Sequence, residues 1–468
     1  MVSRVVRIES ISIENFKNVS KGTLNFENKR KAYKSSVVGL YGQNGSGKTA
    51  LIDAIQLLKF ALCGGQIPQK YADYIHVDAE FATLKFELIV RYPEEEYKVW
   101  YQFSLKKRMD ELMSGVEDET DTERIAGVEL FDEVLSFSYV SKEEKLRKAP
   151  LIDTKTDELF VPKAKLIELV GNNKEEYMDL LVAKRLTKAT SRSFVFSREL
   201  INQYRKRCQN RIYMKLIEGL YTFAHRELFI IGTESIGLIS LNTLPLVFKY
   251  KNDNSEAVGR IMISLDRPTL VPKNAFDLFE KVIENMNIVL EQIVPGLKID
   301  IVDLGASMTN DGKVARQVQL MSLKNSKDIP FCYESEGIKK IVSILQLLIV
   351  VYNHPSVTVA VDELDGGVFE YLLGEILSII SEKGKGQLIF TSHNLRPLET
   401  IDTGFIAFTT TNPEKRYIRL ANVKETNNLR DFYYRDIVLG EQSEQVYNPT
   451  NNYENALAFR EAGEAFGS

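Results

Sequence analysis

The stretch VVGLYGQNGSGKTALIDAIQLLKF, residues 37–60, decides the fold. Its apolar start predicts a buried strand over residues 36–41, and the spacing of apolar residues after it predicts a helix over residues 50–62. Between them, GQNGSGKT fits the pattern G-x-x-x-x-G-K-[ST]. Glycines let backbone N–H groups converge on an anion at the start of the helix, where the helix dipole favours negative charge. The stretch therefore predicts a P-loop that binds a nucleoside triphosphate.

The positions of this loop have different expected roles. Lys48 is expected to reach the β- and γ-phosphates and to assist catalysis, and the Thr49 hydroxyl is expected to hold Mg²⁺. The surrounding backbone is expected to bind the rest of the nucleotide through Gly42, Asn44, Gly45, Ser46, Gly47 and Ala50.

A second apolar run, SVTVAVDELDGG, ends in the acids that complete such a site. Asp362 follows a predicted buried strand and is expected to hold Mg²⁺, and Glu363 is expected to polarise the attacking water as general base. The next predicted strand ends in TSHN, where His393 is expected to contact the γ-phosphate or to order the water. Asp365 is expected to lie in a loop that crosses between subunits.

The composition indicates a protein of the reducing cytosol. The chain has 468 residues, 44% of them hydrophobic, and a net charge of -4, which argues against a strongly basic surface that coats nucleic acid. Its three cysteines lie far apart without a CxxC pair, which excludes a disulfide framework and a zinc site. No signal peptide is evident, and the longest apolar run, residues 341–352, is too short to span a bilayer. We therefore expect a cytoplasmic protein without a membrane partner.

The alternation of strand-like and helix-like segments predicts an α/β fold with a mainly parallel sheet covered on both faces. The expected strands are residues 5–13, 81–90 and 97–105 and the segments VTVAV, QLIF and FIAF. The expected helices are 275–293, 335–352 and 368–381, residues 160–230 are expected to be mostly helical, and residues 299–322 are expected to form a hairpin. We expect four parts: 1–105 and 296–425 as the two halves of an ATPase head, 106–295 as a large, mainly helical insertion that binds a partner or senses a trigger, and 426–468 as a polar tail.

The P-loop, VDE, LD and SHN, in this order, resemble the ABC-type ATPase head. The start ISIENFKNV, followed by LNF and LYGQNGSGKTALIDAI, resembles its non-transporter branch: the structural-maintenance-of-chromosomes proteins, the RecF-like ATPases and the OLD-like (AAA-15 type) ATPases. The resemblance covers residues 1–105 and 296–425. It implies ATP and Mg²⁺ as ligands, and it implies that Lys17 in ENFKN touches nucleotide phosphates.

In that branch a signature motif lies one helix before the strand that ends in the acidic pair, here Asp362 and Glu363. At this position the sequence reads CYESEGIKKIVSIL. Ser335 and Gly337 match the serine and the second glycine of the usual LSGGQ, whereas Glu334, Glu336 and Ile338 replace its other residues. SEG followed by a lysine and a helix is closer to the OLD-like group than to transporters. The resemblance implies that Ser335 and Gly337 meet a γ-phosphate presented by another subunit. The Q-loop residue is left open among Gln66, Gln69 and His76. A GTPase is excluded, because the nearest string to NKxD, NNKEE at Asn172, lacks the aspartate.

ABC-type heads trap two ATP molecules between two subunits, so the resemblance implies a homo-oligomer formed by head-to-head pairing. The long insertion disfavours a transporter subunit, the lack of sustained heptads disfavours a chromosome-type coiled coil, and the short segment after Thr400 cannot hold a TOPRIM nuclease. A stand-alone OLD-like ATPase remains. Such proteins often serve two-component prokaryotic anti-phage systems, PARIS- or Septu-like, with a separate nuclease or toxin as effector.

Two other functions stay open. One is a RecF- or SMC-like ATPase that closes on DNA during repair. The basic segment NQYRKRCQNR is compatible with it, although such a segment is more often a solvated helix face; the cluster comprises Arg205, Lys206, Arg207 and Arg211. The other is an ATP-dependent structural scaffold with little turnover.

Overall fold

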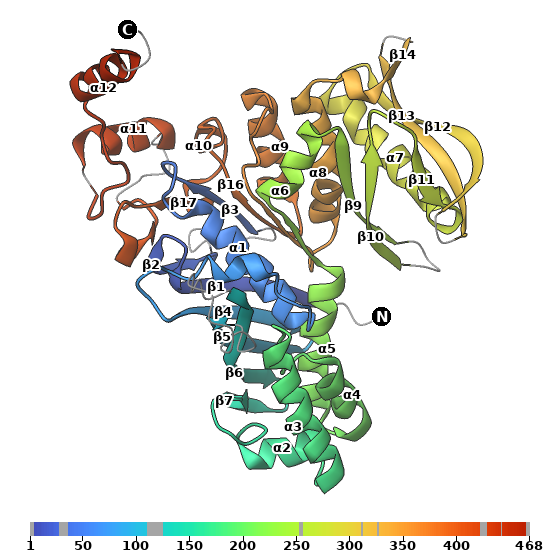
Figure 1. Cartoon of the computed structure of the whole chain (residues 1–468), viewed down its shortest axis with the longest axis vertical. Helices are drawn as coiled ribbons and strands as arrows, with labels where there is room; N and C mark the ends of the chain where they lie inside the picture. The colour runs from blue at the N-terminus through green and yellow to red at the C-terminus, as the bar shows by residue number, and fades with distance from the viewer. Residues whose placement is uncertain are drawn as a thin grey trace, which may run out of the picture.

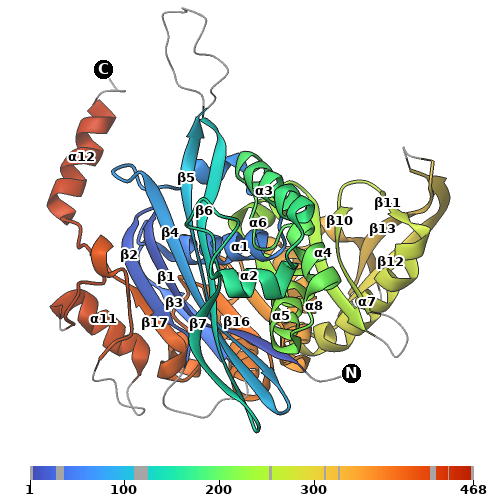
Figure 2. The ribbon, with the colours of Figure 1, turned by 90° about the horizontal axis from the view of Figure 1, so that it is seen from below.

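The fold is taken from a computed structural model of the chain. The described residues are 4–27, 36–109, 125–251, 256–309, 312–324, 327–421, 428–440 and 442–464. Figure 1 shows a central sheet, an antiparallel sheet below it, and a third group of strands and helices on the side opposite to α11 and α12, an arrangement that Figure 2 shows from below.

The central sheet confirms the predicted α/β fold. Its order is β18-β17-β3-β16-β15-β8, and every pairing except β17 with β18 is parallel. The strands are β3 (Ser36–Tyr41), β8 (Leu228–Ile231), β15 (Thr358–Val361), β16 (Gln387–Thr391), β17 (Ile406–Thr409) and β18 (Tyr417–Ile418). Strands β15, β16 and β17 are buried along their whole length, as expected for a parallel sheet covered on both faces.

Alternate residues of these strands face two different cores. Val38 and Leu40 of β3 pack in one core with α1 (Lys48–Leu62), whereas Val37 and Tyr41 pack in another with α8 (Glu336–Asn353) and α9 (Glu370–Lys383). Since successive strand residues point to opposite faces, α1 covers one face of the sheet and α8 and α9 cover the other. The two halves of the nucleotide site are thus fixed at the carboxyl ends of β3 and β15.

Two expected boundaries differ from the structure. The boundary between 105 and 106 falls inside β5 (Glu95–Met109), which continues its pairing with β6 (Ile125–Ser141). Strand β8, expected within the insertion, pairs in parallel with β15 and is therefore part of the central sheet. An edge strand of four residues has too little pattern to be assigned to a sheet from sequence, because its partner lies more than a hundred residues away.

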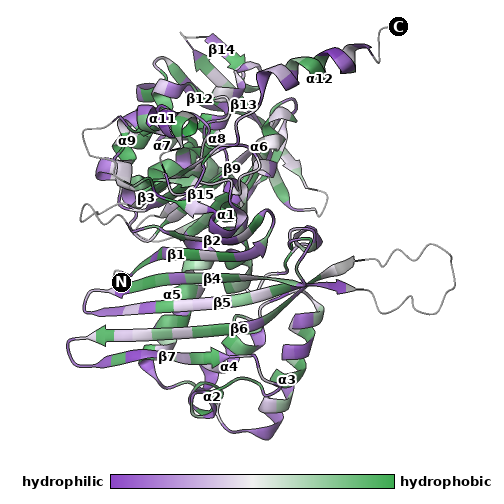
Figure 3. Ribbon diagram, turned by 90° about the vertical axis from the view of Figure 1, so that its left-hand side faces the viewer, coloured by the Kyte–Doolittle hydropathy of each residue, from purple (hydrophilic) through white to green (hydrophobic). Residues whose placement is uncertain are grey.

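The antiparallel sheet packs on the other side of α1. Its order is β2-β1-β4-β5-β6-β7, and Figure 3 shows these strands stacked below the central sheet. The further elements are β1 (Val5–Phe16), β2 (Val19–Asn25), β4 (Phe81–Tyr92), β7 (Lys145–Asp153), α2 (Lys163–Val170), α3 (Lys174–Ala189), α4 (Arg198–Arg207) and α5 (Arg211–Arg226). The predicted helical segment 160–230 corresponds to these four helices.

Polar contacts fasten the antiparallel sheet to its surroundings. Gln387 of β16 accepts a hydrogen bond from the Ile8 backbone N–H and donates one to its carbonyl oxygen, at 3.1 and 2.8 Å. Glu133 of β6 is 2% exposed, and its carboxylate accepts hydrogen bonds from one tyrosine hydroxyl, one serine hydroxyl and two backbone N–H groups. Such a buried carboxylate is tolerated because its hydrogen-bonding capacity is filled.

The third group confirms the predicted helix 275–293 and the hairpin that follows it. Helix α7 (Lys273–Ile293) packs on β12 (Leu297–Met308) and β13 (Val314–Lys324), which pair antiparallel; residues 310–311 of the hairpin turn lie outside the described residues. The remaining elements of this group are α6 (Thr233–Ser240), β9 (Thr243–Lys251), β10 (Glu256–Ser264), β11 (Thr269–Pro272) and β14 (Lys327–Pro330). The expected insertion thus contains strands as well as helices.

The polar tail contains two helices that the loop-like sequence did not predict. Helix α11 (Leu429–Leu439) contributes to the core beside the central sheet, and every residue of α12 (Asn452–Glu464) is exposed (Figure 1). Within the described part of the chain, no helix combines the length and apolarity needed to cross a membrane.

Candidate nucleotide site

The P-loop joins β3 to α1 and has the backbone of a phosphate cradle. Gly42, Gly45 and Gly47 have φ angles of 151°, 73° and 94°, which favour glycine. A Cβ at Gly42 would lie 1.8 Å from Thr409 Oγ1, so a side chain has no room there. Helix α1 has no side-chain cap at its start, which leaves its first N–H groups facing the loop. The loop therefore offers bare N–H groups to an anion, as the sequence predicts.

Lys48 closes the loop from its carboxyl end. Its ammonium donates hydrogen bonds of 2.8 Å to the carbonyl oxygens of Gly42 and Gln43. Burial lowers the pKa of Lys48, although the charges of Asp362 and Glu363 act in the opposite direction. Because these carboxylates lie near the same ammonium, Lys48 can exchange its carbonyl partners for phosphate oxygens without moving to a new environment.

Residues far away in the sequence hold the loop in place, and sequence reasoning missed them. Asn18 donates a hydrogen bond to the Gly45 carbonyl oxygen, and the Tyr417 hydroxyl donates one of 2.9 Å to that of Gly47. The backbone N–H of Asn448 donates one of 2.9 Å to Gln43 Oε1. No local pattern marks these residues, because their roles arise only when the turn between β1 and β2, strand β18 and the tail reach the P-loop.

Most predicted site residues meet at a single cavity of about 470 Å³. It is lined by Lys17, Asn18, Asn44, Gly45, Ser46, Gly47, Lys48, Thr49, Ala50, Asp362, Glu363 and His393. The Ser46 hydroxyl, for which the sequence predicted no separate role, bonds to the Gln43 carbonyl oxygen at 2.6 Å and to Thr409 Oγ1 at 2.5 Å. The Ser46 side chain therefore shapes the loop, and only its backbone is placed to meet a nucleotide.

Asp362 carries an orphaned oxygen that suits a hard cation. Its side chain is 1% exposed; Oδ1 accepts a hydrogen bond of 2.5 Å from the Thr391 hydroxyl, and Oδ2 has no hydrogen-bond partner among the described residues. Thr49 lines the same cavity. A carboxylate and a hydroxyl are oxygen ligands of the kind that Mg²⁺ takes beside nucleotide phosphates. The residues present therefore fit a Mg²⁺ ion held by Asp362 and Thr49.

Glu363 lies at the mouth of the cavity in an uncommon backbone conformation. Its φ is 47°, in the left-handed region, and its N–H donates a hydrogen bond of 2.8 Å to Thr391 Oγ1. Its side chain is exposed and lines the cavity together with His393. One threonine hydroxyl thus bonds both to the predicted metal ligand Asp362 and to the backbone of the predicted general base.

Asp365 contacts the His393 loop rather than the cavity. Its Oδ2 accepts hydrogen bonds of 3.0 and 2.8 Å from the N–H groups of His393 and Asn394. This geometry gives Asp365 a role in placing His393 within its own subunit, which the sequence did not predict. A further role between subunits stays a prediction.

Ser335 and Gly337 also lie outside the set that lines the cavity. The Ser335 hydroxyl caps α8 by accepting a hydrogen bond of 3.3 Å from the Ile338 N–H. A Cβ at Gly337 would lie 2.1 Å from the Gly367 carbonyl oxygen, so the start of α8 packs directly on the loop after Glu363. The signature segment cannot serve the nucleotide site of its own chain in this arrangement.

Lys17 lines the cavity, and its side chain is held by Asp53 and Tyr74. Its ammonium forms an ion pair with Asp53 of α1 and lies 4.0 Å from the centre of the Tyr74 ring. Burial raises the pKa of Asp53, and the hydrogen bond from Lys17 opposes that effect. The side chain is thus fixed beside the phosphate loop, with its positive charge shared with Asp53.

The Q-loop candidates do not lie at this cavity. A second cavity of about 320 Å³ adjoins the nucleotide cavity and shares Lys17, Thr49 and Asp362 with it. The three candidates, Gln66, Gln69 and His76, line neither cavity. Gln56 of α1 lines the adjoining cavity instead. A Q-loop glutamine is expected in the segment after the first helix, and a glutamine within that helix carries no comparable sequence signal.

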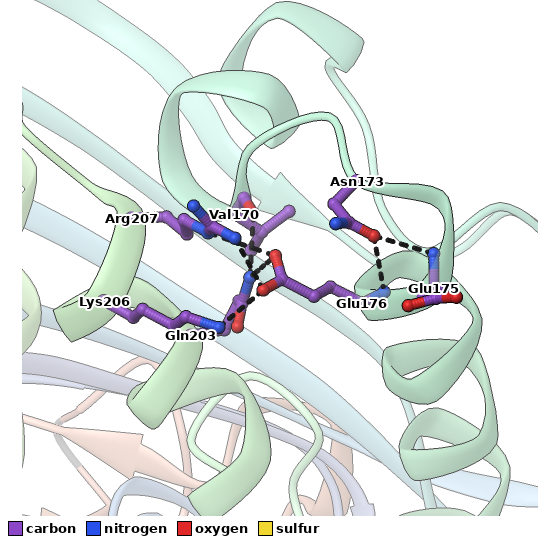
Figure 4. Close-up of polar contacts among 7 residues, drawn as sticks. All are labelled: Val170, Asn173, Glu175, Glu176, Gln203, Lys206 and Arg207. Carbon is purple, nitrogen blue, oxygen red and sulfur yellow. Dashed lines mark hydrogen bonds and ion pairs between the residues drawn. The ribbon is translucent and has the colours of Figure 1, made fainter.

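The residues of the basic cluster on α4 and α5 are paired with acidic neighbours, although Lys206 and Arg207 share one carboxylate. Lys206 and Arg207 both pair with Glu176 of α3, at 2.6 and 2.7 Å, as Figure 4 shows. Arg207 and Lys206 lower the pKa of Glu176 to about 2. Arg205 pairs with Glu218 at 2.7 Å. Cations that already have carboxylate partners offer little to a phosphate backbone, because binding would break existing ion pairs.

Comparisons with known proteins agree with a nucleotide-binding domain. The family model described as an AAA domain matches residues 10–220, which include the P-loop, and no curated relative matches the chain. The chain is similar to a structure of the Smc head domain bound to the C-terminal domain of ScpA from Pyrococcus furiosus. The two are 13% identical, the match covers 89% of this chain and 96% of the Smc chain, and the TM-score is 0.41. The SMC head domain of Thermotoga maritima has 13% identity, 88% and 99% coverage and a TM-score of 0.35.

The recombination mediator protein RecF with ATP has 13% identity, 89% coverage of this chain, 100% of that chain and a TM-score of 0.37. These structural similarities are too distant to carry an inference about function. The family match supports an AAA-type ATPase domain over residues 10–220 of this α/β chain.

Proposed function

We propose that the chain is an ATPase head that binds and hydrolyses ATP with Mg²⁺, and that ATP-dependent pairing of two heads controls a separate effector protein. The observation that carries the proposal is the single cavity in which the P-loop backbone, Lys48, Asp362 and Glu363 meet. A cavity of about 470 Å³ is within the usual range for small-molecule sites.

The residues divide the chemistry between them. The P-loop N–H groups, Lys48 and Lys17 bind the phosphates, and Thr49 and Asp362 would hold Mg²⁺, which neutralises phosphate charge when bound. Glu363 would accept a proton from the attacking water, because it lines the cavity beside Lys48 and Asp362 while its backbone is fixed. His393, fixed through its backbone by Asp365, helps to order that water.

Pairing would complete the site from outside. Ser335 is exposed at the start of α8 and lies away from the cavity of its own chain, so it can meet the γ-phosphate held by a second copy, whereas Gly337 is buried and would need the start of α8 to shift. ATP then favours the paired state because only that state makes these contacts, and hydrolysis removes them.

The effector is proposed from the family resemblance alone. An OLD-like ATPase head implies a separate nuclease or toxin in a prokaryotic anti-phage system, with the region 106–295 as the surface that binds the partner or senses the trigger. The DNA-repair alternative is weakened by the ion pairs that occupy the basic cluster. A scaffold with little turnover remains the second alternative. The rate of ATP hydrolysis distinguishes this scaffold from the proposed ATPase.

The test measures ATP hydrolysis and subunit mass together. The variant Glu363→Gln should still bind ATP but hydrolyse it at least ~100-fold more slowly, as expected for the loss of a general base, and should accumulate as a paired species with ATP. Adding Ser335→Arg should abolish pairing, while Asn202→Arg, at an exposed position of α4, should not. Unchanged turnover in Glu363→Gln would assign the base elsewhere, and pairing that survives Ser335→Arg would reject the proposed interface.

A further inference from the structure

Lys340 is a buried lysine next to the catalytic loop. It belongs to α8, one turn after the signature segment, and its side chain is 2% exposed. Its ammonium donates a hydrogen bond to the backbone carbonyl oxygen of Glu363. A Cβ at Gly366 would lie 2.8 Å from this ammonium, so the loop passes directly over it. The lysine thus links the signature helix to the residue proposed as general base.

The charges around Lys340 explain why it can be buried. Burial lowers its pKa, and the negative charges of Asp365, Glu363 and Asp362 act in the opposite direction. A buried ammonium is tolerated when it has carboxylates nearby and a carbonyl oxygen to bond. Lys340 and Lys48 therefore bring positive charge to the acidic loop from two different elements.

The peptide that Lys340 contacts is the one that needs support. Glu363 has a φ of 47°, in the left-handed region that non-glycine residues rarely adopt. Its N–H is held by Thr391 Oγ1, and its carbonyl oxygen is held by Lys340 and by the Gly366 N–H. A strained backbone persists where the surroundings determine it on both sides, and here it fixes the conformation of a residue that lines the cavity.

We propose that Lys340 is a positioning residue that fixes the direction of Glu363 and couples it to the start of α8. Movement of α8 when Ser335 meets a second copy's nucleotide would move Lys340 and thereby re-aim the Glu363 carboxylate. The direct packing of Gly337 on Gly367 gives this coupling a second, rigid contact. The coupling rests on the proposed function, because it assumes that Glu363 acts on water and that two heads pair.

The test compares Lys340→Met with Lys339→Met. Methionine keeps an unbranched apolar stem but removes the charge and the donor. Lys339 lies next to Lys340 on the same helix and is also buried, and in the described part of the chain it has no hydrogen bond or ion pair to the Glu363 loop. The control therefore matches the change in charge and the helix while sparing the contact in question.

The first measurement needs no nucleotide. Amide hydrogen exchange across residues 362–368 should be faster in Lys340→Met than in wild type, and should be unchanged in Lys339→Met, because only the former loses the bond to Glu363. Equal exchange in the two variants would show that Lys340 does not hold the loop and would overturn the proposal.

The second measurement separates positioning from general destabilisation. Lys340→Met should bind ATP within about threefold of wild type and should still pair with ATP, but should hydrolyse it about 10- to 100-fold more slowly. In the Glu363→Gln background the same substitution should cause no further loss, because residues that act through one group are non-additive.

An equal fractional loss in both backgrounds would show that Lys340 acts independently of Glu363 and would overturn the inference. Failure of the proposed function has a different signature: wild-type turnover that does not depend on Glu363, or heads that never pair with ATP.

Discussion

The Thr391 hydroxyl offers the sharpest test of the site, because one oxygen connects the metal ligand to the general base. It donates a hydrogen bond to Asp362 Oδ1 at 2.5 Å and accepts one from the Glu363 N–H at 2.8 Å. The substitution Thr391→Val keeps the shape of the side chain and removes both bonds. Thr391 is 0% exposed, so water cannot replace the lost hydroxyl.

The magnitude follows from the two bonds. A hydrogen bond to a charged group contributes about 1.5–3 kcal/mol, and each 1.36 kcal/mol in a barrier is about tenfold in rate. If the bond to Asp362 serves mainly to orient the Asp362–Glu363 pair for reaction, ATP turnover should fall between about 10-fold and about 150-fold. Loss of the acceptor for the Glu363 N–H should also lower the melting temperature.

The assay measures steady-state ATP hydrolysis over a range of Mg²⁺ concentrations, together with the melting temperature. The matched control is Thr358→Val on the adjacent strand β15, whose buried hydroxyl bonds to Gln387 Oε1 at 3.0 Å at the opposite end of the sheet. The control should lose about 1 kcal/mol of stability and no activity. Wild-type turnover and Mg²⁺ dependence in Thr391→Val would refute the role assigned to this hydroxyl.

Three further predictions follow from other contacts. Lys48→Ala should weaken ATP binding by at least about 100-fold, since a charged partner of the phosphates is lost; tight binding measured by calorimetry would contradict its assignment. Glu133→Ala should destabilise the antiparallel sheet by about 3 kcal/mol or more, seen as a lower melting temperature, because four buried donors lose their acceptor. The pKa of Glu176 is lowered to about 2 by Arg207 and Lys206, so its stabilising effect is complete above the ordinary carboxyl pKa and is lost as pH falls toward 2. The difference in melting temperature between wild type and Glu176→Gln should therefore shrink as pH falls below about 4.5, and a constant difference would count against this ion pair.

The catalytic half of the site was predictable because its signals are local. The P-loop lies within eight consecutive residues, and Asp362 and Glu363 directly follow a strand that is mostly apolar and buried throughout. Parallel strands in a doubly covered sheet leave their carboxyl ends at one edge, so these motifs were expected to meet, and they line one cavity.

The supporting residues were not predictable, because each acts across a long sequence separation. Asn448 reaches Gln43, and Lys340 reaches a carbonyl oxygen rather than a side chain. A backbone acceptor has no sequence signature at all. Strand β8 was assigned to the insertion for the same reason: four apolar residues carry too little information to identify a partner more than a hundred residues away.

The position of β3 in the central sheet has a consequence for biosynthesis. Its two neighbours are β16 and β17, and the first of them ends at Thr391, roughly 350 residues after Tyr41. At translation rates of about 5–20 residues per second, the nascent strand waits on the order of 20 to 70 s for a partner, with both edges unpaired. The antiparallel sheet uses only residues before Thr154, so it can form on the ribosome long before β16 is made. It would then cover α1 while β3 is still without its partner strands. Ribosome-bound chains that end before residue 387 should accordingly contain a folded antiparallel sheet and no ATP pocket.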